Sequence, residues 1–103
     1  GISDATVEIL YDEMKEDGKD TNLPLKIQTS HKVTDGINVI SINNAEIKHI
    51  PMTITSTESI DDNQIIKGSV DLKEMSKHFQ KGINRFILKI GEEESEVILD
   101  VEL

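Results

Sequence analysis

The chain contains no cysteine and no tryptophan, and its aromatic residues are one tyrosine and two phenylalanines. The absence of cysteine excludes disulfides, thiolate metal ligands, iron–sulfur clusters and a cysteine nucleophile. The scarcity of aromatic rings argues against a platform on which nucleic-acid bases stack. The absence of tryptophan argues in the same way against a carbohydrate-stacking site.

Positive charge is also scarce. One arginine, Arg85, and ten lysines face 20 acidic residues among 103, which gives a net charge of −9. Because domains that bind nucleic acid are usually basic, we expect no nucleic-acid partner. An acidic chain is also a poor match for an anionic membrane surface, and no apolar run approaches the length of a spanning helix. We therefore expect no membrane insertion.

Motifs for catalysis and for cofactor binding are missing. There is no nucleophile elbow, phosphate-binding loop or zinc-binding histidine pair, and His31, His49 and His78 are far apart in the sequence. Ser30, His31 and Asp35 are residue types of a catalytic triad, but residue types without geometry are weak evidence. We therefore expect that the protein is not an enzyme and binds no cofactor or metal.

Three clusters of acidic residues are the one pattern that could contradict this expectation. Ca²⁺ prefers several oxygen ligands, which such clusters can supply. None has the spacing of an EF-hand, so solvated loop tips are the favoured interpretation and a calcium-dependent binding domain is a further alternative. The clusters are Asp12, Glu13, Glu16, Asp17 and Asp20; Asp61, Asp62 and Asn63; and Glu92, Glu93, Glu94 and Glu96.

The apolar residues are mainly branched aliphatics: 16 isoleucines, seven leucines and six valines. Branching at Cβ stiffens the side chain and favours the pleated strand over the helix. This aliphatic content is large enough to build a core, so we expect a folded domain despite the high charge.

The C-terminal segment shows the clearest strand pattern. Apolar residues alternate with other residues over 84–90 and over 97–103, with an acidic segment between them. This pattern predicts a β-hairpin with one buried face. The predicted register places Ile90 opposite Val97, Leu88 opposite Leu99, Phe86 opposite Val101 and Arg85 opposite Glu102.

Ile87 and Ile98 break the alternation, because they fall on the outer face of this hairpin, where polar residues are expected. Two explanations remain open. The two side chains could contact a neighbouring domain or another protein, or they could lie under a loop or a second layer of the same domain. They are the candidate partner-contact residues of the chain.

Further strands are predicted at 23–29, at 37–42 (as a strand buried on both faces), in one or two pieces over 45–56, and at 64–70. Pro51 interrupts the third segment and favours a sheet edge. A polar loop is expected at 59–63. Asp71 and Glu74 resemble a capping box, so a short helix is predicted over 72–80 with His78 facing solvent.

The segment 4–16 is ambiguous. Val7, Ile9 and Tyr11 fit the period of a strand, which we favour at 6–12. Val7, Leu10, Tyr11 and Met14 instead fit one face of a helix. The predicted fold is therefore an all-β antiparallel sandwich of about seven strands with one short helix near 72–80. The alternative is an α+β domain with an N-terminal helix at 4–16.

The stretch from Leu72 through Phe79 and Gly82 to Ile90, followed by Glu96 to Leu103, resembles the last two strands of bacterial immunoglobulin-like modules. It covers about a third of the chain. The sequence departs from the immunoglobulin pattern because it lacks the cysteine pair, the core tryptophan and the tyrosine corner. The resemblance implies a β-sandwich of the kind that bacterial surface proteins and phage tails string together, and it identifies no functional residue.

The chain starts with Gly1 instead of methionine and its last residues still have a strand pattern. We therefore expect residues 2–103 to be a single β-sandwich module cut from a longer protein. The resemblance makes a non-catalytic spacer or adhesion module of a bacterial extracellular protein the first hypothesis. A phage tail or baseplate module is the alternative. The expected partners are neighbouring domains of the same chain or another protein.

Overall fold

The computed structural model describes residues 5–14, 21–33, 36–91 and 96–103. Within these ranges the chain forms eight strands and two short 3-10 helices. The strands are β1 (Ala5–Ile9), β2 (Asn22–Thr29), β3 (Ile37–Ile42), β4 (Ala45–Pro51), β5 (Thr53–Ile60), β6 (Asn63–Asp71), β7 (Ile83–Ile90) and β8 (Glu96–Glu102), and the helices are η1 (Tyr11–Glu13) and η2 (Lys73–His78).

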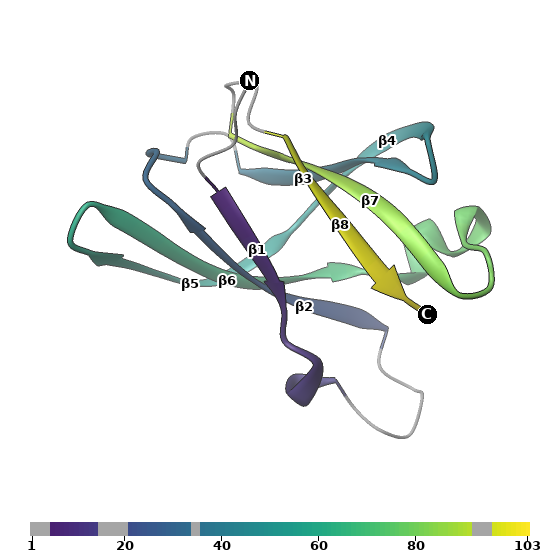
Figure 1. Cartoon of the computed structure of the whole chain (residues 1–103), viewed down its shortest axis with the longest axis horizontal. Helices are drawn as coiled ribbons and strands as arrows, with labels where there is room; N and C mark the ends of the chain where they lie inside the picture. Colours follow the sequence, from purple (N-terminus) through teal and green to yellow (C-terminus); the bar gives the residue numbers. More distant parts are fainter. Residues whose placement is uncertain (1–4, 15–20, 34–35, 92–95) are drawn as a thin grey trace.

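The strands form two four-stranded sheets, with the orders β1-β2-β6-β5 and β4-β3-β7-β8. Every pair of neighbouring strands is antiparallel. Figure 1 shows the two sheets facing each other, with β1 and β8 next to one another and running in the same direction. The predicted all-β antiparallel sandwich is therefore confirmed.

One apolar core fills the space between the sheets because side chains alternate along each strand. Phe86, Leu25 and Val70 are completely buried and come from strands of both sheets. The alternation fails to predict one detail of β3. This strand has the expected bounds, but Asn38 and Ile40 are only half-buried, so it is fully covered on one face and not on both.

The N-terminal segment forms a strand over Ala5–Ile9 that pairs with β2. The alternative helix at 4–16 is therefore wrong within the described residues, since η1 is a single 3-10 turn. The half-buried Val7 and Ile9 pack against the core, as the period-2 pattern predicts. The expected strand at 6–12 is too long, because β1 ends at Ile9 and Tyr11 lies in η1 with 53% of its surface exposed.

Pro51 ends β4, and the chain passes through the single residue Met52 into β5 in the opposite sheet. Both strands are edge strands, as the proline predicts. The main-chain N–H of Met52 donates to the carbonyl of Ile37 at 2.8 Å, which holds the crossing against β3. The crossing also passes close to the backbone of Gly68, where a Cβ atom would overlap the carbonyl oxygen of Thr53.

The polar loop expected at 59–63 is wrong. β5 continues to Ile60 and β6 begins at Asn63, so Asp61 and Asp62 form a two-residue hairpin turn. Asp61 has a φ of 53°, a conformation that aspartate tolerates better than most residues. Polar composition is a poor guide here because β5 is exposed along its whole length and carries polar residues on both faces.

The register of the C-terminal hairpin differs from the expected one by two residues. Phe86 lies opposite Leu99, Leu88 opposite Val97 and Arg85 opposite Asp100. A shift of two residues leaves every side chain on its predicted face, so apolar alternation cannot distinguish the two registers. The charges could have done so, because the observed register places both Arg85 and Lys89 opposite acidic residues.

The predicted helix over 72–80 is a 3-10 helix restricted to Lys73–His78. Asp71 accepts a hydrogen bond from the N–H of Lys73 at 2.8 Å, two residues further on, and the expected capping box is absent. Met75 is completely buried and anchors η2 to the core. The six residues of η2 are enough to bury Met75, and the chain then continues into β7.

Candidate functional site

The two candidate contact residues lie directly opposite each other. Ile87 of β7 and Ile98 of β8 are cross-strand partners on the outer face of the β4-β3-β7-β8 sheet. Ile98 is 60% exposed and Ile87 is half-buried. Within the described residues, no second layer covers Ile98, so the explanation that it lies under a loop is not supported there. We call these two residues the isoleucine pair.

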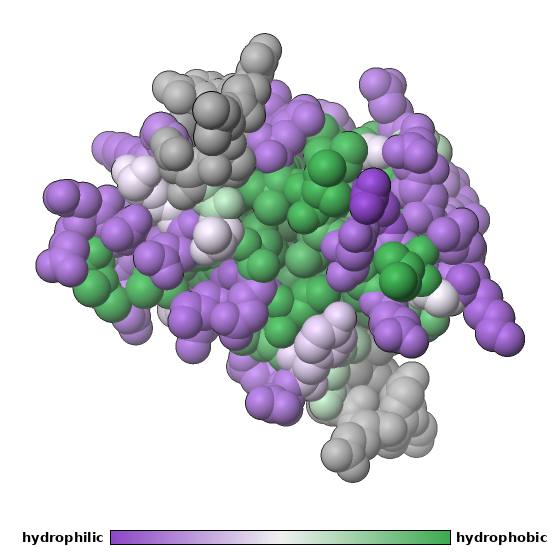
Figure 2. Space-filling model, in the orientation of Figure 1, coloured by the Kyte–Doolittle hydropathy of each residue, from purple (hydrophilic) through white to green (hydrophobic). Residues whose placement is uncertain are grey.

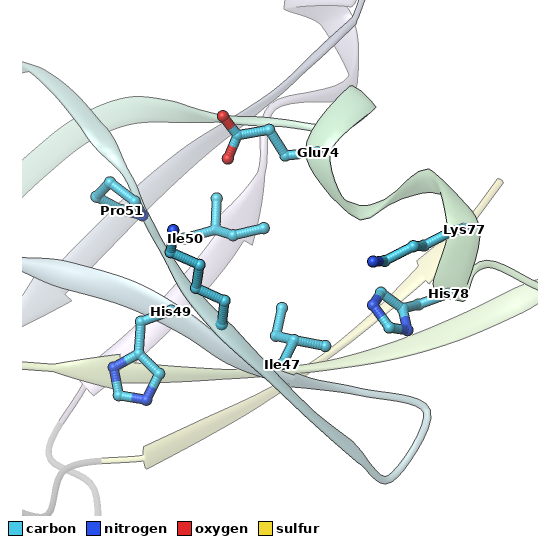
Figure 3. Close-up of a pocket in the computed structure, with 8 residues that line it drawn as sticks. Ile47, His49, Ile50, Pro51, Glu74, Lys77 and His78 are labelled. Atoms are coloured by element: carbon cyan, nitrogen blue, oxygen red, sulfur yellow. The ribbon is translucent and has the colours of Figure 1, made fainter.

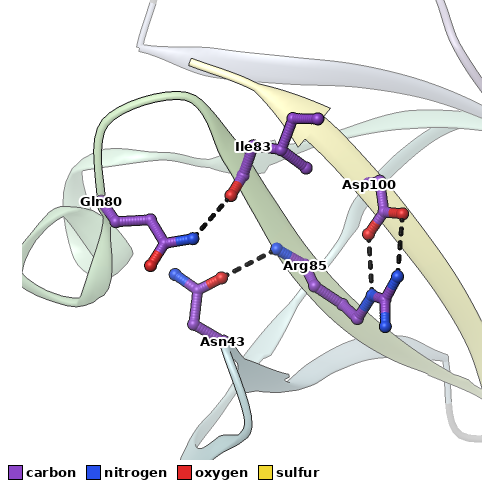
Figure 4. A network of polar contacts seen from close by, with 5 residues as sticks. All are labelled: Asn43, Gln80, Ile83, Arg85 and Asp100. Atoms are coloured by element: carbon purple, nitrogen blue, oxygen red, sulfur yellow. Dashed lines mark hydrogen bonds and ion pairs between the residues drawn. The ribbon is translucent and has the colours of Figure 1, made fainter.

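An ion pair flanks the isoleucine pair on the same face. Nε and Nη2 of Arg85 donate to the two carboxylate oxygens of Asp100 at 2.9 and 3.1 Å, as Figure 4 shows. The hydrogen bond from Arg85 lowers the pKa of the Asp100 carboxyl, and the pKa of the guanidinium is raised by the same contact. Both side chains are about half exposed, so the ion pair contributes little to the stability of the fold. Its main effect is to hold the two side chains in one orientation on this face.

A network of amides lies at the start of β7. Asn43 has a φ of 51° in the turn between β3 and β4, and its Oδ1 accepts a hydrogen bond from the N–H of Arg85 at 2.9 Å (Figure 4). Its Nδ2 donates to the carbonyl of His78 and to Oδ1 of Asn84. The network thus ties the turn to both η2 and β7.

A groove of about 530 Å³ lies between β4 and η2. Its floor is apolar, with Ile47 half-buried and Ile50 only 7% exposed. Figure 3 shows Lys77 and His78 pointing from η2 across the groove toward β4, and Glu74 pointing toward Pro51. Lys48 and His49 complete the lining from β4. The groove therefore combines an apolar floor with two ammonium groups, two imidazoles and one carboxylate.

Sequence reasoning missed this groove because its two walls are more than 20 residues apart in the sequence. It also misjudged His78, which was expected to face solvent and is half-buried in the wall. The available signal was weak: Lys77-His78 and Lys48-His49 are both basic dipeptides in an acidic chain. Nothing in the sequence indicates that the fold places them on one groove.

Some of the remaining candidates border a second surface hollow. Ser30 and His31 line it together with Asp61, Asp62 and Asn63 of the second acidic cluster. Asp35 and most of the first and third acidic clusters fall outside the described residues. Within the described ranges, no group of three or more histidine, aspartate or glutamate side chains could hold a metal ion. The absence of a bound metal and of enzymatic activity stay predictions, and the calcium-dependent binding domain stays an untested alternative.

Apolar side chains are visible on a second part of the surface. Figure 2 shows them gathered over β1 and β8, surrounded by hydrophilic side chains. β1 and β8 are edge strands of different sheets, so the core is partly open between them. The half-buried Val7, Ile9 and Val97 line this side of the core.

Among the described residues, no helix has the length and the apolar character needed to cross a membrane. Comparison with known protein families, with curated proteins and with solved structures gives no match for this chain.

Proposed function

We propose that this chain is a non-catalytic structural or adhesion module of a larger bacterial extracellular protein. The observation that carries the proposal is the path of the chain through the sandwich. β1 and β8 lie side by side and run in the same direction, so β8 leaves the domain at the end opposite to the start of β1 (Figure 1). Domains with this geometry can be joined end to end, as a spacer requires.

The order of the strands supports the proposal. The sheet β1-β2-β6-β5 has the connectivity of the ABED sheet of immunoglobulin domains, and β3-β7-β8 has that of their CFG sheet. The remaining strand, β4, extends the second sheet at its edge. A bacterial surface setting is implied by the sequence resemblance to such modules and not by the strand order.

The isoleucine pair favours a second function, that of an assembly module such as those of phage tails or baseplates. An apolar pair on the outer face of a sheet is suited to a contact between subunits. In the spacer, the same pair would contact the neighbouring domain of its own parent chain. The two functions therefore differ in whether the chain associates with itself.

Incubation of the folded chain with a broad panel of hydrolase, transferase and oxidoreductase substrates tests the non-catalytic character. We expect no turnover above that of the heat-unfolded chain, which is the matched control. A specific turnover that disappears on replacing residues of the groove between β4 and η2 would overturn the proposal.

A further inference from the structure

We propose that the groove between β4 and η2 binds an extended acidic segment of a partner protein, with one apolar side chain of that segment on the groove floor. This inference is independent of the module function, because that function rests on the path of β1 and β8 and not on the groove. Ile47 and Ile50 supply an apolar floor in the groove. Its volume, about 530 Å³, falls in the range of ligand-binding clefts.

The charges around the groove indicate which sign of charge a partner should carry. Two lysines, Lys48 and Lys77, line the groove with a single carboxylate, Glu74, so positive charge is in excess there. In a chain of net charge −9, this is a local concentration of basic groups. Such a concentration attracts an anionic partner and repels a cationic one.

The two ammonium groups are available for a partner. Neither Lys48 nor Lys77 forms an ion pair or a side-chain hydrogen bond within the described part of the chain. Arg85 differs from them, because Asp100 already neutralises its guanidinium. Figure 3 shows the amino group of Lys77 directed across the groove and not away from it.

The shape of the groove favours an extended segment over a compact anion. Five consecutive residues of β4, from Ile47 to Pro51, line it, so the groove follows the strand. Among the described strands, β4 is the edge of its sheet and pairs with no neighbour on that side. A peptide can therefore pair with main-chain groups of this edge, while its side chains alternate between the apolar floor and the lysines.

Titration of the isotope-labelled chain with the peptide Ac-ELDLE-NH2, followed by amide NMR shifts, tests the proposal. We expect saturable shifts confined to the amides of residues 47–50 and 74–78. The neutral peptide Ac-QLNLQ-NH2 is the matched control and should bind at least about tenfold more weakly. N-acetylglutamate tests whether a small molecule with free carboxylates binds as well as the peptide does. An affinity equal to that of the acidic peptide would overturn the assignment of an extended segment.

Two charge reversals locate the site. Lys77→Glu should weaken binding of the acidic peptide about tenfold, because it replaces an attraction by a repulsion. Lys67→Glu makes the same change of net charge on an exposed residue of β6 outside the groove and should leave the affinity within about twofold. Both side chains are exposed, and unchanged circular dichroism would confirm that both variants fold.

Three results would overturn the proposal: equal binding of the neutral peptide, an equal effect of the two reversals, or shifts centred on β8. None of these results bears on the association state of the chain, so failure here would leave the module function standing.

Discussion

Asn43 donates a hydrogen bond from its side-chain Nδ2 to Oδ1 of Asn84 at 2.9 Å, across 41 residues of sequence. Asn84 is completely buried, yet its amide is fully satisfied. Its Oδ1 also accepts from the N–H of Gln80, and its Nδ2 donates to the carbonyls of Gln80 and Gly82. This pair of asparagines therefore holds η2, the β3–β4 turn and the start of β7 in one arrangement, which also fixes one wall of the groove.

Asn84→Ala is expected to lower the free energy of unfolding by about 3 kcal/mol, because it leaves several buried polar groups without partners. Chemical denaturation followed by circular dichroism measures the change. Gln28→Ala, an exposed position on β2, is the control and should change stability by less than about 0.5 kcal/mol. A loss at Asn84 as small as that of the control would show that the network is not needed for the fold.

Gly68→Ala is expected to destabilise the protein by more than about 2 kcal/mol, since the new methyl group would overlap the backbone where the chain crosses between the sheets. Gly36→Ala is the matched comparison. Gly36 has a φ of 76° but open space around it, so only the backbone cost of about 1 kcal/mol applies. Thermal unfolding of both variants would test whether Gly68→Ala is the more destabilising of the two. A smaller effect at Gly68 would argue against the close approach of the backbones where the chain crosses between the sheets.

The ion pair between Arg85 and Asp100 predicts a pH dependence of known sign. The pKa of Asp100 is lower in the folded state than in the unfolded state, so the stabilisation is fully present above the unfolded pKa. It is lost as the pH falls through the folded pKa. Carboxyl NMR titration should give a pKa for Asp100 below the usual range, and Arg85→Gln should restore the usual value. An unchanged pKa in that variant would contradict the ion pair.

The absence of cysteine allows the hairpin register to be tested by cross-linking. Ile87→Cys combined with Ile98→Cys should form a disulfide readily, because directly opposed residues have Cβ atoms close to the required separation. Lys89→Cys combined with Ile98→Cys is the control, since these positions are opposed only in the register expected from the apolar pattern. Preferential oxidation of the control pair would show that the observed register is wrong.

The sequence predicts the parts of the fold that depend on apolar alternation. Strand β3 begins and ends at the residues predicted from the alternation. The predicted break at Pro51 separates two strands, β4 and β5, that are both edge strands. The hairpin faces are also correct, whereas the register is wrong by two residues. The reason is that alternation defines which face a residue is on, but pairing depends on the particular side chains that meet, such as Arg85 and Asp100.

The candidate sites were predictable to different degrees. Ile87 and Ile98 stand out because each breaks a local pattern within one strand. The groove depends instead on the packing of η2 against β4, and that packing is fixed by the burial of Met75 and by the hydrogen bonds of Asn43. Those interactions join distant segments, so no local pattern contains them.

The association state of the chain tests the proposed module function most directly. Sedimentation velocity over a wide range of concentrations, on the wild-type chain and on Ile98→Asp, would measure it. The account predicts a monomer in both cases, because a spacer uses the isoleucine pair against a neighbouring domain of its parent chain. A stable oligomer that Ile98→Asp dissociates would contradict the spacer and would favour an assembly module in its place.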